Sequence, residues 1–190
     1  MKILQVGLGN NPGGMEAFVM NYFRELAGDI TMTYTACYFL ELAGYYAVEN
    51  QNGAEMLNLI YAAFKALLNP SLDNRLVRYV YELKMLVING EYPDFFACRV
   101  CGAKDNAAGF SISHNGIVCD GCIRNIADAI TLCGGTVYTL QYIVYSEIGR
   151  LFTFRVSDEV LEELRMVMAR CMNTYVDRRM NSLEILDALI

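Results

Sequence analysis

The sequence is poor in the residues and patterns that mark several protein classes. It contains only three prolines, and 55% of its 190 residues are hydrophobic against 19% charged, which argues against an extensively disordered chain. No uninterrupted apolar run reaches the roughly twenty residues of a membrane-spanning helix. Met1 is followed by the strand-like MKILQVG and a glycine-rich loop, which does not resemble a secretory signal. These absences predict a globular, cytoplasmic protein.

Positive charge is also scarce. The chain has 15 lysines and arginines against 21 aspartates and glutamates, which gives a formal net charge of −6 and a pI near 4.8. A surface that holds nucleic acid mainly by neutralising phosphates needs a dense basic patch, and the sequence contains no dense basic run. The composition therefore argues against a surface built mainly to hold nucleic acid.

Histidine occurs once, at position 114, in a segment that alternates in the manner of a strand, FSISHNGIVC. A role as a general base or an additional metal ligand stays open, but a solvated turn residue is the simpler interpretation. Asn115 and Gly116 follow directly, and this dipeptide readily adopts the positive φ angles of a tight hairpin turn. We therefore predict a β-hairpin that turns at these two residues.

Most of the remaining chain has the periodicity of α-helices. Segments 32–48, 54–68 and 72–88 each read as a helix, and Ser71 is a candidate N-cap for the third. A further long helix is expected to open at Ser157, where the acidic Asp158 and Glu159 would stabilise its N-terminal end. The pattern predicts a mainly α protein, a helical bundle with an inserted hairpin.

Four of the seven cysteines form two pairs with the spacing of a zinc ribbon. Cys98 and Cys101 are separated by two residues, as are Cys119 and Cys122, and the predicted hairpin would bring the two pairs together. Four thiolates complete a tetrahedral shell and leave no open position for water, so a single structural Zn²⁺ is the favoured cofactor.

Other interpretations of the cysteines are a redox dithiol and unmetallated core residues. Disulfides are less favoured, because the number of cysteines is odd and cytoplasmic thiols stay reduced. The remaining three lie in apolar helical patterns and are predicted to be small buried residues: Cys37, Cys133 and Cys171.

The first residues differ from the rest of the chain. MKILQVG reads as a strand, GNNPGG as a turn and MEAFVMNYFREL as a helix, and this segment resembles the opening of a glycosyltransferase of the two-Rossmann-domain type. A dinucleotide fingerprint that begins with Gly7 and Gly9 would need glycine at position 12, where Pro12 stands. A segment this short cannot transfer a sugar alone. Residues 1–29 are therefore interpreted as a glycosyltransferase-like fragment.

From about Ile30 to its end, the sequence resembles the C-terminal region of RecO, the bacterial recombination mediator of DNA repair. The resemblance is carried by YFLELAGYYAVEN, ALLNPSLDNRLVRYVYELKMLVINGEYPDF, the two cysteine pairs, TVYTLQYIVYS, LFTFRVSDEVLEELRMVM and NSLEILDAL. It implies a RecO-like helical domain over residues 30–190 with a zinc ribbon at 98–122. Its metal ligands would be Cys98, Cys101, Cys119 and Cys122. The oligonucleotide-binding barrel that opens a complete RecO is not expected in this sequence.

The resemblance also implies a function without catalysis. RecO displaces single-strand-binding protein, works with RecR, helps load RecA and anneals complementary strands. The expected partners are therefore RecR, the tail of single-strand-binding protein, RecA and, weakly, single-stranded DNA, with no membrane and no enzymatic activity. A generic zinc-stabilised interaction module and a glycosyltransferase fragment are the alternative hypotheses.

One segment is a candidate site for the acidic, phenylalanine-ending tail of single-strand-binding protein. Such a tail needs an apolar pocket and cations, and GRLFTFR offers both kinds of group. Alternation along an extended segment would place Arg150, Phe152 and Phe154 on one side and Arg155 on the other. The alternative is that the phenylalanines belong to the core and the arginines are only solvated.

Overall fold

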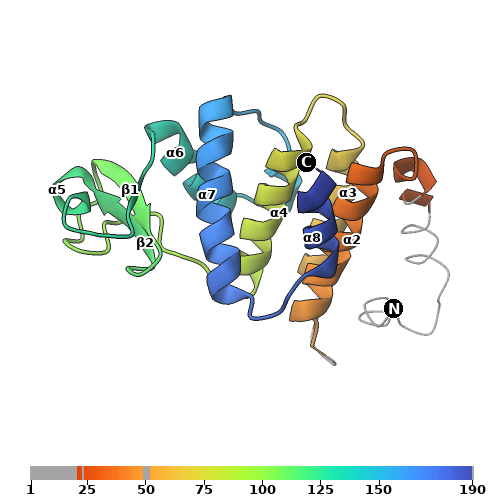
Figure 1. Ribbon diagram of the computed structural model, residues 1–190, viewed down its shortest axis with the longest axis horizontal. Helices are drawn as coiled ribbons and strands as arrows, with labels where there is room; N and C mark the ends of the chain where they lie inside the picture. The colour runs from red at the N-terminus through yellow and green to blue at the C-terminus, as the bar shows by residue number, and fades with distance from the viewer. Residues whose placement is uncertain (1–20, 23, 49–51, 190) are drawn as a thin grey trace. The chain divides into compact units, whose positions relative to one another are not determined.

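The computed structural model describes residues 21–22, 24–48 and 52–189. Most of the predicted N-terminal strand, loop and helix therefore lies outside the described residues. The chain divides into two compact units, one formed by the residues up to Tyr81 together with 178–190, the other by Glu82–Asp177 (Figure 1). Within the described ranges, no helix combines the length and the apolar character needed to cross a membrane.

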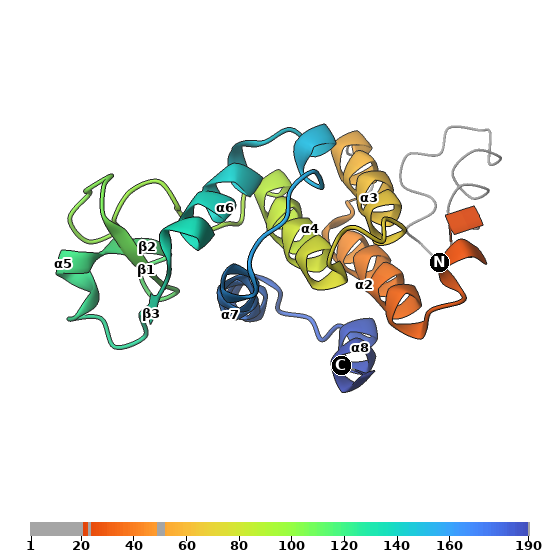
Figure 2. The same cartoon turned by 90° about the horizontal axis from the view of Figure 1, so that it is seen from above.

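The first unit is helical. It contains α2 (Ile30–Tyr46), α3 (Ala54–Leu67), the first part of α4 (Asn74–Ile88) and α8 (Asn181–Leu189). Helix α2 packs against α3 and α8, and Figure 2 shows α2 and α3 beside α4. Phe39 and Tyr81 are fully buried and their rings stack with centroids 4.0 Å apart. The Tyr81 hydroxyl donates to the Phe39 carbonyl at 2.6 Å, so burial leaves no unpaired phenol.

Helix α8 is tied to the rest of the first unit by charged side chains. The Glu41 carboxylate accepts hydrogen bonds from the backbone N–H groups of Asn181 and Ser182 at 3.0 and 2.9 Å. Arg78 donates to Asp187 at 2.9 Å. Because the first N–H groups of a helix have no partner within it, Glu41 of α2 caps α8.

The predicted helices that fall within the described residues are confirmed, with different boundaries. Helix α4 begins two residues later than predicted, because Asp73 and not Ser71 caps it. The Asp73 carboxylate accepts from the Arg75 N–H at 2.8 Å, and the Asp73 carbonyl accepts from the Val77 N–H at 3.1 Å. The long helix α7 (Asp158–Tyr175) opens where it was expected, with the Ser157 side chain accepting from the Val160 N–H.

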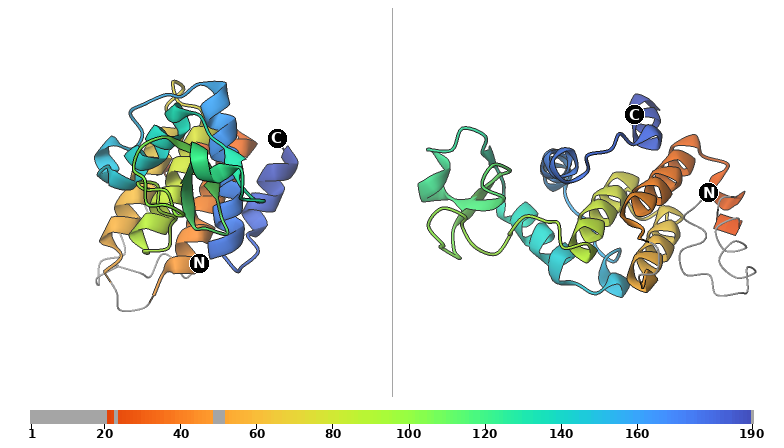
Figure 3. Two further views of the ribbon diagram at one scale, coloured as in Figure 1. Left: turned by 90° about the vertical axis from the view of Figure 1, so that its left-hand side faces the viewer. Right: turned by 90° about the horizontal axis from the view of Figure 1, so that it is seen from below.

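The second unit combines a small sheet with helices (Figure 3). Strands β1 (Ala107–Ser111), β2 (Gly116–Cys119) and β3 (Ile130–Thr131) form an antiparallel sheet in the order β2-β1-β3. The short α5 (Asp120–Ile123) follows β2. Helix α6 (Gly134–Tyr145) packs against α7, and the 3₁₀ helix η2 (Ile148–Arg150) follows α6. The prediction of a mainly α protein with an inserted hairpin is confirmed.

The hairpin turns over more residues than predicted. Ile112–Asn115 form the loop and Gly116 is already the first residue of β2. Asn115 has a φ of 55°, the left-handed conformation that asparagine tolerates. Gly116 is needed for a different reason: a Cβ there would lie 2.3 Å from the carbonyl oxygen of Asp94, which pairs with Gly116 in an isolated bridge.

A buried cation joins α4 to α6 inside the second unit. Lys84 is only 6% exposed, and its Nζ lies 3.5, 3.2 and 2.7 Å from the carbonyl oxygens of Ile143, Val144 and Ser146. These carbonyls stand at the C-terminal end of α6, where helix carbonyls lack partners and the helix dipole is negative. Lys84 therefore supplies the donors that close this helix end.

Candidate metal centre and partner surface

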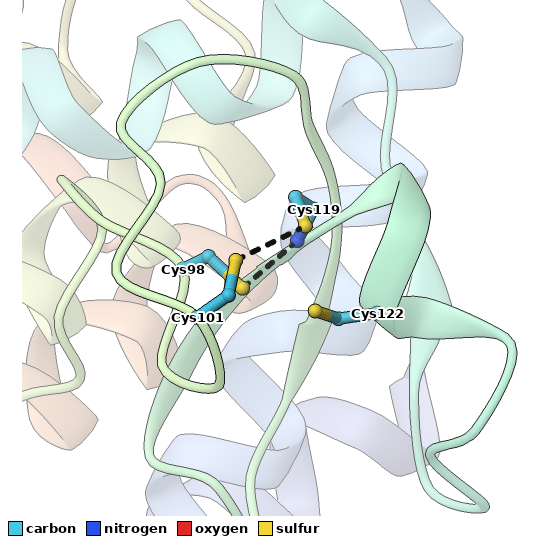
Figure 4. Close-up of side chains that lie close together, drawn as sticks. All are labelled: Cys98, Cys101, Cys119 and Cys122. Atoms are coloured by element: carbon cyan, nitrogen blue, oxygen red, sulfur yellow. Dashed lines mark hydrogen bonds between the residues drawn. The ribbon is translucent and has the colours of Figure 1, made fainter.

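The four cysteines of the two pairs converge beside the small sheet. All four Sγ atoms lie within 4.8 Å of one another, and Figure 4 shows the side chains facing a common point. Cys98 and Cys101 come from the loop before β1, Cys119 ends β2 and Cys122 lies in α5. Cys98 and Cys119 are buried, whereas Cys101 is exposed. We call residues 94–131, which carry this cluster, the cysteine module.

Backbone hydrogen bonds shape the loop around the first pair. The Cys98 N–H donates to the Ala103 carbonyl at 2.7 Å, and the Gly102 N–H donates to the Cys98 carbonyl at 2.8 Å. Gly102 has a φ of 76°, which glycine adopts without steric cost. From the second pair, the Cys119 N–H donates to Cys98 Sγ at 3.3 Å. The two pairs are therefore joined by this backbone donor as well as by the sheet.

The spacing of the sulfurs fits a tetrahedral metal ion. With a Zn–S distance of about 2.3 Å, neighbouring sulfurs of a Cys₄ site are about 3.8 Å apart. Cys101 Sγ and Cys119 Sγ are 3.6 Å apart. Around the cluster pack the apolar side chains of Val118, Ile123 and Ile126. Four soft sulfur donors in apolar surroundings suit Zn²⁺ better than a hard cation such as Mg²⁺.

The thiols of the cluster differ in acidity. Burial raises the pKa of the Cys98 thiol, but the N–H groups of Cys101, Cys119 and Val100 outweigh it, and the pKa falls to about 6. The pKa of Cys122 is raised to about 12, chiefly by the neighbouring thiols of Cys119 and Cys101. Ionising all four sulfurs at such short distances requires a compensating cation.

His114 belongs to a network that fixes the hairpin loop. The hydroxyls of Ser111 and Ser113 donate to Asp128 Oδ1 at 2.8 and 2.7 Å, and His114 Nδ1 lies 3.0 and 3.1 Å from the same hydroxyl oxygens. With both hydroxyl hydrogens directed at Asp128, the arrangement fits the tautomer in which Nδ1 carries a proton and donates. A general base would need the opposite polarity. In that tautomer His114 activates neither serine.

Asp128 is the central acceptor of this network. Its pKa lies well below the usual range, first because of the hydrogen bond from the Ser113 hydroxyl, with further contributions from the Ser113 N–H and the Ser111 hydroxyl that exceed the opposing effect of burial. Asp128→Asn is expected to lower the free energy of unfolding of the cysteine module by about 1–2 kcal/mol at neutral pH. Chemical denaturation of the zinc-loaded protein measures it.

The pH dependence follows from the direction of the Asp128 shift. A carboxylate with a lowered folded pKa contributes stability that is fully present above its unfolded pKa, about 3.9, and is lost as the pH falls through the folded value. The effect of Asp128→Asn should therefore be equal at about pH 6 and about pH 8. Asp105→Asn, at an exposed carboxylate of the same module, is the matched control. An effect no larger than the control's would contradict this role of Asp128.

Side chains from α6 and α7 form hydrogen bonds to the cysteine module. Gln141 of α6 donates to the Phe95 carbonyl at 2.7 Å. From α7, Arg170 donates to the Asp128 carbonyl, and the Tyr175 hydroxyl donates to Asn115 Oδ1. The module is therefore fixed to these helices mainly through its loops.

The other three cysteines differ in burial. Cys171 is buried, as predicted, and burial raises its pKa, whereas Cys37 and Cys133 are half-buried. Cys133 Sγ lies within 4.8 Å of carboxylate oxygens of Glu159 and Glu163. The Cys133 N–H donates to Glu163 at 2.9 Å, and Cys133 is the N-cap residue of α6. Glu163 therefore satisfies a backbone donor at the start of α6, which explains this cluster as a helix cap.

The segment predicted to bind a partner is not extended throughout. Arg150 ends η2 and is exposed, Leu151 is buried, and Phe152 and Phe154 are half-buried. Because a helical turn runs into this segment, the strand-like alternation that separated Arg150 from Arg155 does not apply. Phe154 and Arg155 instead border a groove of about 250 Å³, which we call the tyrosine groove. It is lined by Tyr138, Thr139, Tyr142, Phe154, Arg155 and Val156.

Sequence reasoning missed the tyrosine groove. It joins residues of α6 to a segment that follows η2, and the two meet through the edge-to-face contact of Tyr142 with Phe154, whose ring centroids are 5.2 Å apart. The Tyr142 hydroxyl donates to the Arg150 carbonyl at 3.1 Å. The spacing of tyrosines along α6 was the one signal in the sequence that could have indicated it.

Comparisons with known proteins agree with one another. The family described as Recombination protein O C terminal matches residues 27–184. A protein named DNA repair protein RecO from Acetivibrio thermocellus is 26% identical over 172 residues, covering 90% of this chain and 68% of that protein. Proteins of the same name from Bacillus velezensis and Listeria monocytogenes are 27% identical over 183 residues and 28% over 159. These cover 96% and 84% of this chain, which spans 70% and 60% of the respective relatives.

Proposed function

Since the chain belongs to the Recombination protein O C-terminal family, we propose that it acts in recombinational DNA repair as a mediator that binds partners and catalyses no reaction. The family match over residues 27–184 is the observation that carries this proposal. We assign this role to residues 30–190 and expect the protein in the cytoplasm.

The proposed cofactor is one structural Zn²⁺ bound by Cys98, Cys101, Cys119 and Cys122. The clustering of their sulfurs and the donors around Cys98 support this ligand set. The ion would supply a cross-link between the loop before β1 and the end of β2. With four protein ligands it would offer no position to a substrate, so its role would be in folding.

The proposed partners are RecR, the tail of single-strand-binding protein and RecA, with weak binding of single-stranded DNA. A pull-down from purified components tests the mediator function: the zinc-loaded chain should retain RecR and single-strand-binding protein. If it retains neither, the chain is a zinc-stabilised interaction module with a different role.

The tail of single-strand-binding protein is proposed to contact Arg150, Phe152 and Phe154. Arg150 is exposed and the two phenylalanines are half-buried, so their side chains can reach a ligand. Arg150→Glu is expected to weaken binding of the synthetic tail peptide by about 1–3 kcal/mol, because a charge pair is replaced by repulsion. Isothermal titration calorimetry measures the change.

Two further variants sharpen the tail experiment. Arg124→Glu, at an exposed arginine in the cysteine module, makes the same change in net charge and should leave binding unchanged. Arg155→Glu tests the cation that lines the tyrosine groove. A loss of affinity with Arg155→Glu alone would move the tail to that groove. The absence of heat at hundreds of micromolar peptide would remove the tail as a partner.

A further inference from the structure

Helix α6 exposes a stripe of tyrosines. Tyr138, Tyr142 and Tyr145 are spaced four and three residues apart and so share one face of the helix. Tyr138 is 68% exposed and Tyr145 is 88% exposed, whereas Tyr38 and Tyr81 of the first unit are fully buried. Burying a large aromatic side chain is favourable, so a group of such side chains that stays exposed to solvent marks an interaction surface.

Tyr138 and Tyr142 of this stripe line the tyrosine groove, which gives them a second wall, whereas Tyr145 lies farther along α6 beside it. Phe154, Arg155 and Val156 line it opposite the residues of α6. The rings of Tyr138 and Tyr142 are nearly parallel, at 28° with centroids 6.4 Å apart. Tyr142 is also fixed by its edge-to-face contact with Phe154 and by its hydrogen bond to the Arg150 carbonyl. The groove is therefore preformed and does not need to be ordered by its ligand.

We propose that the tyrosine groove binds a proline-rich peptide segment in the polyproline II conformation that carries a carboxylate. With 1.5 Å of rise per residue, Tyr142 and Tyr145 stand about 6.0 and 10.5 Å along α6 from Tyr138. A polyproline II chain rises about 3.1 Å per residue and has three residues per turn, so its first and fourth residues share one face about 9.3 Å apart. The first and fourth residues of such a peptide laid along α6 therefore approach the spacing of Tyr138 and Tyr145.

The chemistry of the groove fits the same ligand. A polyproline II backbone makes no internal hydrogen bonds, so its carbonyl oxygens are free to accept from the exposed hydroxyls of Tyr138 and Tyr145, while proline rings pack on aromatic faces. The ligand's conformation exists before binding, which lowers the entropy lost. Arg155 is the one charged side chain among the described lining residues, and it selects a ligand with a carboxylate.

Charge argues against nucleic acid as the occupant. Grooves for single-stranded DNA combine stacking rings with cations that follow the phosphates, and this groove offers one lining arginine in a chain of net charge −6. The peptide proposal goes beyond the proposed repair function and does not depend on it.

Fluorescence anisotropy with the zinc-loaded chain tests the proposal. The probe is a labelled synthetic peptide that repeats Pro-Pro-Glu-Pro-Pro, and saturable binding is expected. The double change Tyr138→Ala with Tyr145→Ala should weaken binding by about tenfold or more, as for aromatic anchors of an interface. Arg155→Glu should weaken binding of this peptide but not of its glutamine counterpart. Tyr61→Ala, at a tyrosine of α3 that is 48% exposed, should change nothing.

The tyrosines to be replaced are exposed, so the variants should fold, and circular dichroism verifies this. Equal binding of a peptide with alanine in place of every proline would overturn the proposal, as would no binding at hundreds of micromolar. It is also overturned if a single-stranded oligonucleotide or the phenylalanine-ending tail occupies the groove and the proline-rich peptide does not. The repair function is tested separately, by the pull-down with RecR and single-strand-binding protein.

Discussion

Cys101→Ser is expected to unfold the cysteine module and leave the helices of the first unit folded. Structural zinc in small domains contributes on the order of 10 kcal/mol of apparent binding free energy, which is comparable to the whole stability of a domain. The sheet of the module is small, with one strand of only two residues, so it cannot replace that contribution. The first unit has its own core around Phe39, Phe64 and Tyr81 and should remain helical.

The measurements are elemental analysis and amide hydrogen exchange. The unaltered protein, purified without chelator, should contain about one equivalent of zinc, because the four sulfurs form one cluster. The variant should lose the zinc and the exchange protection of β1 and β2. Cys37→Ser, which changes a cysteine of α2, should retain the metal. Less than half an equivalent of zinc in the unaltered protein would refute the metal assignment.

Lys84→Met is expected to destabilise the second unit by about 2–4 kcal/mol. The substitution keeps most of the buried length of the side chain but removes the ammonium group. The carbonyls of Ile143, Val144 and Ser146 would then lose their donor, and the end of α6 would lose its compensating charge. Unpaired buried carbonyls are costly because water cannot reach them.

Guanidinium denaturation of the zinc-loaded protein measures this change, with hydrogen exchange reporting on α6. Lys65→Met is the matched control, since Lys65 is exposed on α3 and its replacement should alter stability by less than about 0.5 kcal/mol. If the two variants are equally stable, Lys84 does not close α6 in the way described.

The fold was predictable where the signal is local. Apolar spacing located α2, α3 and α4 within a few residues, and Ser157 with two acidic residues marked the start of α7. The cysteine spacing indicated that the four thiols would meet, because the two cysteines of each pair are only three positions apart and the hairpin between the pairs is encoded by an alternating pattern. The predicted turn was too short. Gly116 belongs to β2 and is required there by its close approach to Asp94, a contact between residues that are distant in the sequence.

The features that escaped prediction depend on contacts between distant segments. Lys84 lies within a helical pattern, and nothing near it shows that it will meet carbonyls about sixty residues away. Asp128 and Ser113 are likewise separated by 15 residues. Phe154 and Tyr142 meet only because η2 reverses the chain between them, so the tyrosine groove was not visible from either segment alone.

The order of the two units along the chain affects how the protein folds during synthesis. The first unit is discontinuous, since it is completed by residues 178–190, whereas Glu82–Asp177 form the second unit without a break. A chain emerging from the ribosome can therefore finish the second unit while the first still lacks α8. Until α8 arrives, the face of α2 that it covers stays uncovered, and Glu41 has no helix end to cap. Translation that stops shortly before Asn181 would leave an intact cysteine module attached to an unfinished helical unit. The uncovered face of α2 would make such a product a target for quality-control proteases.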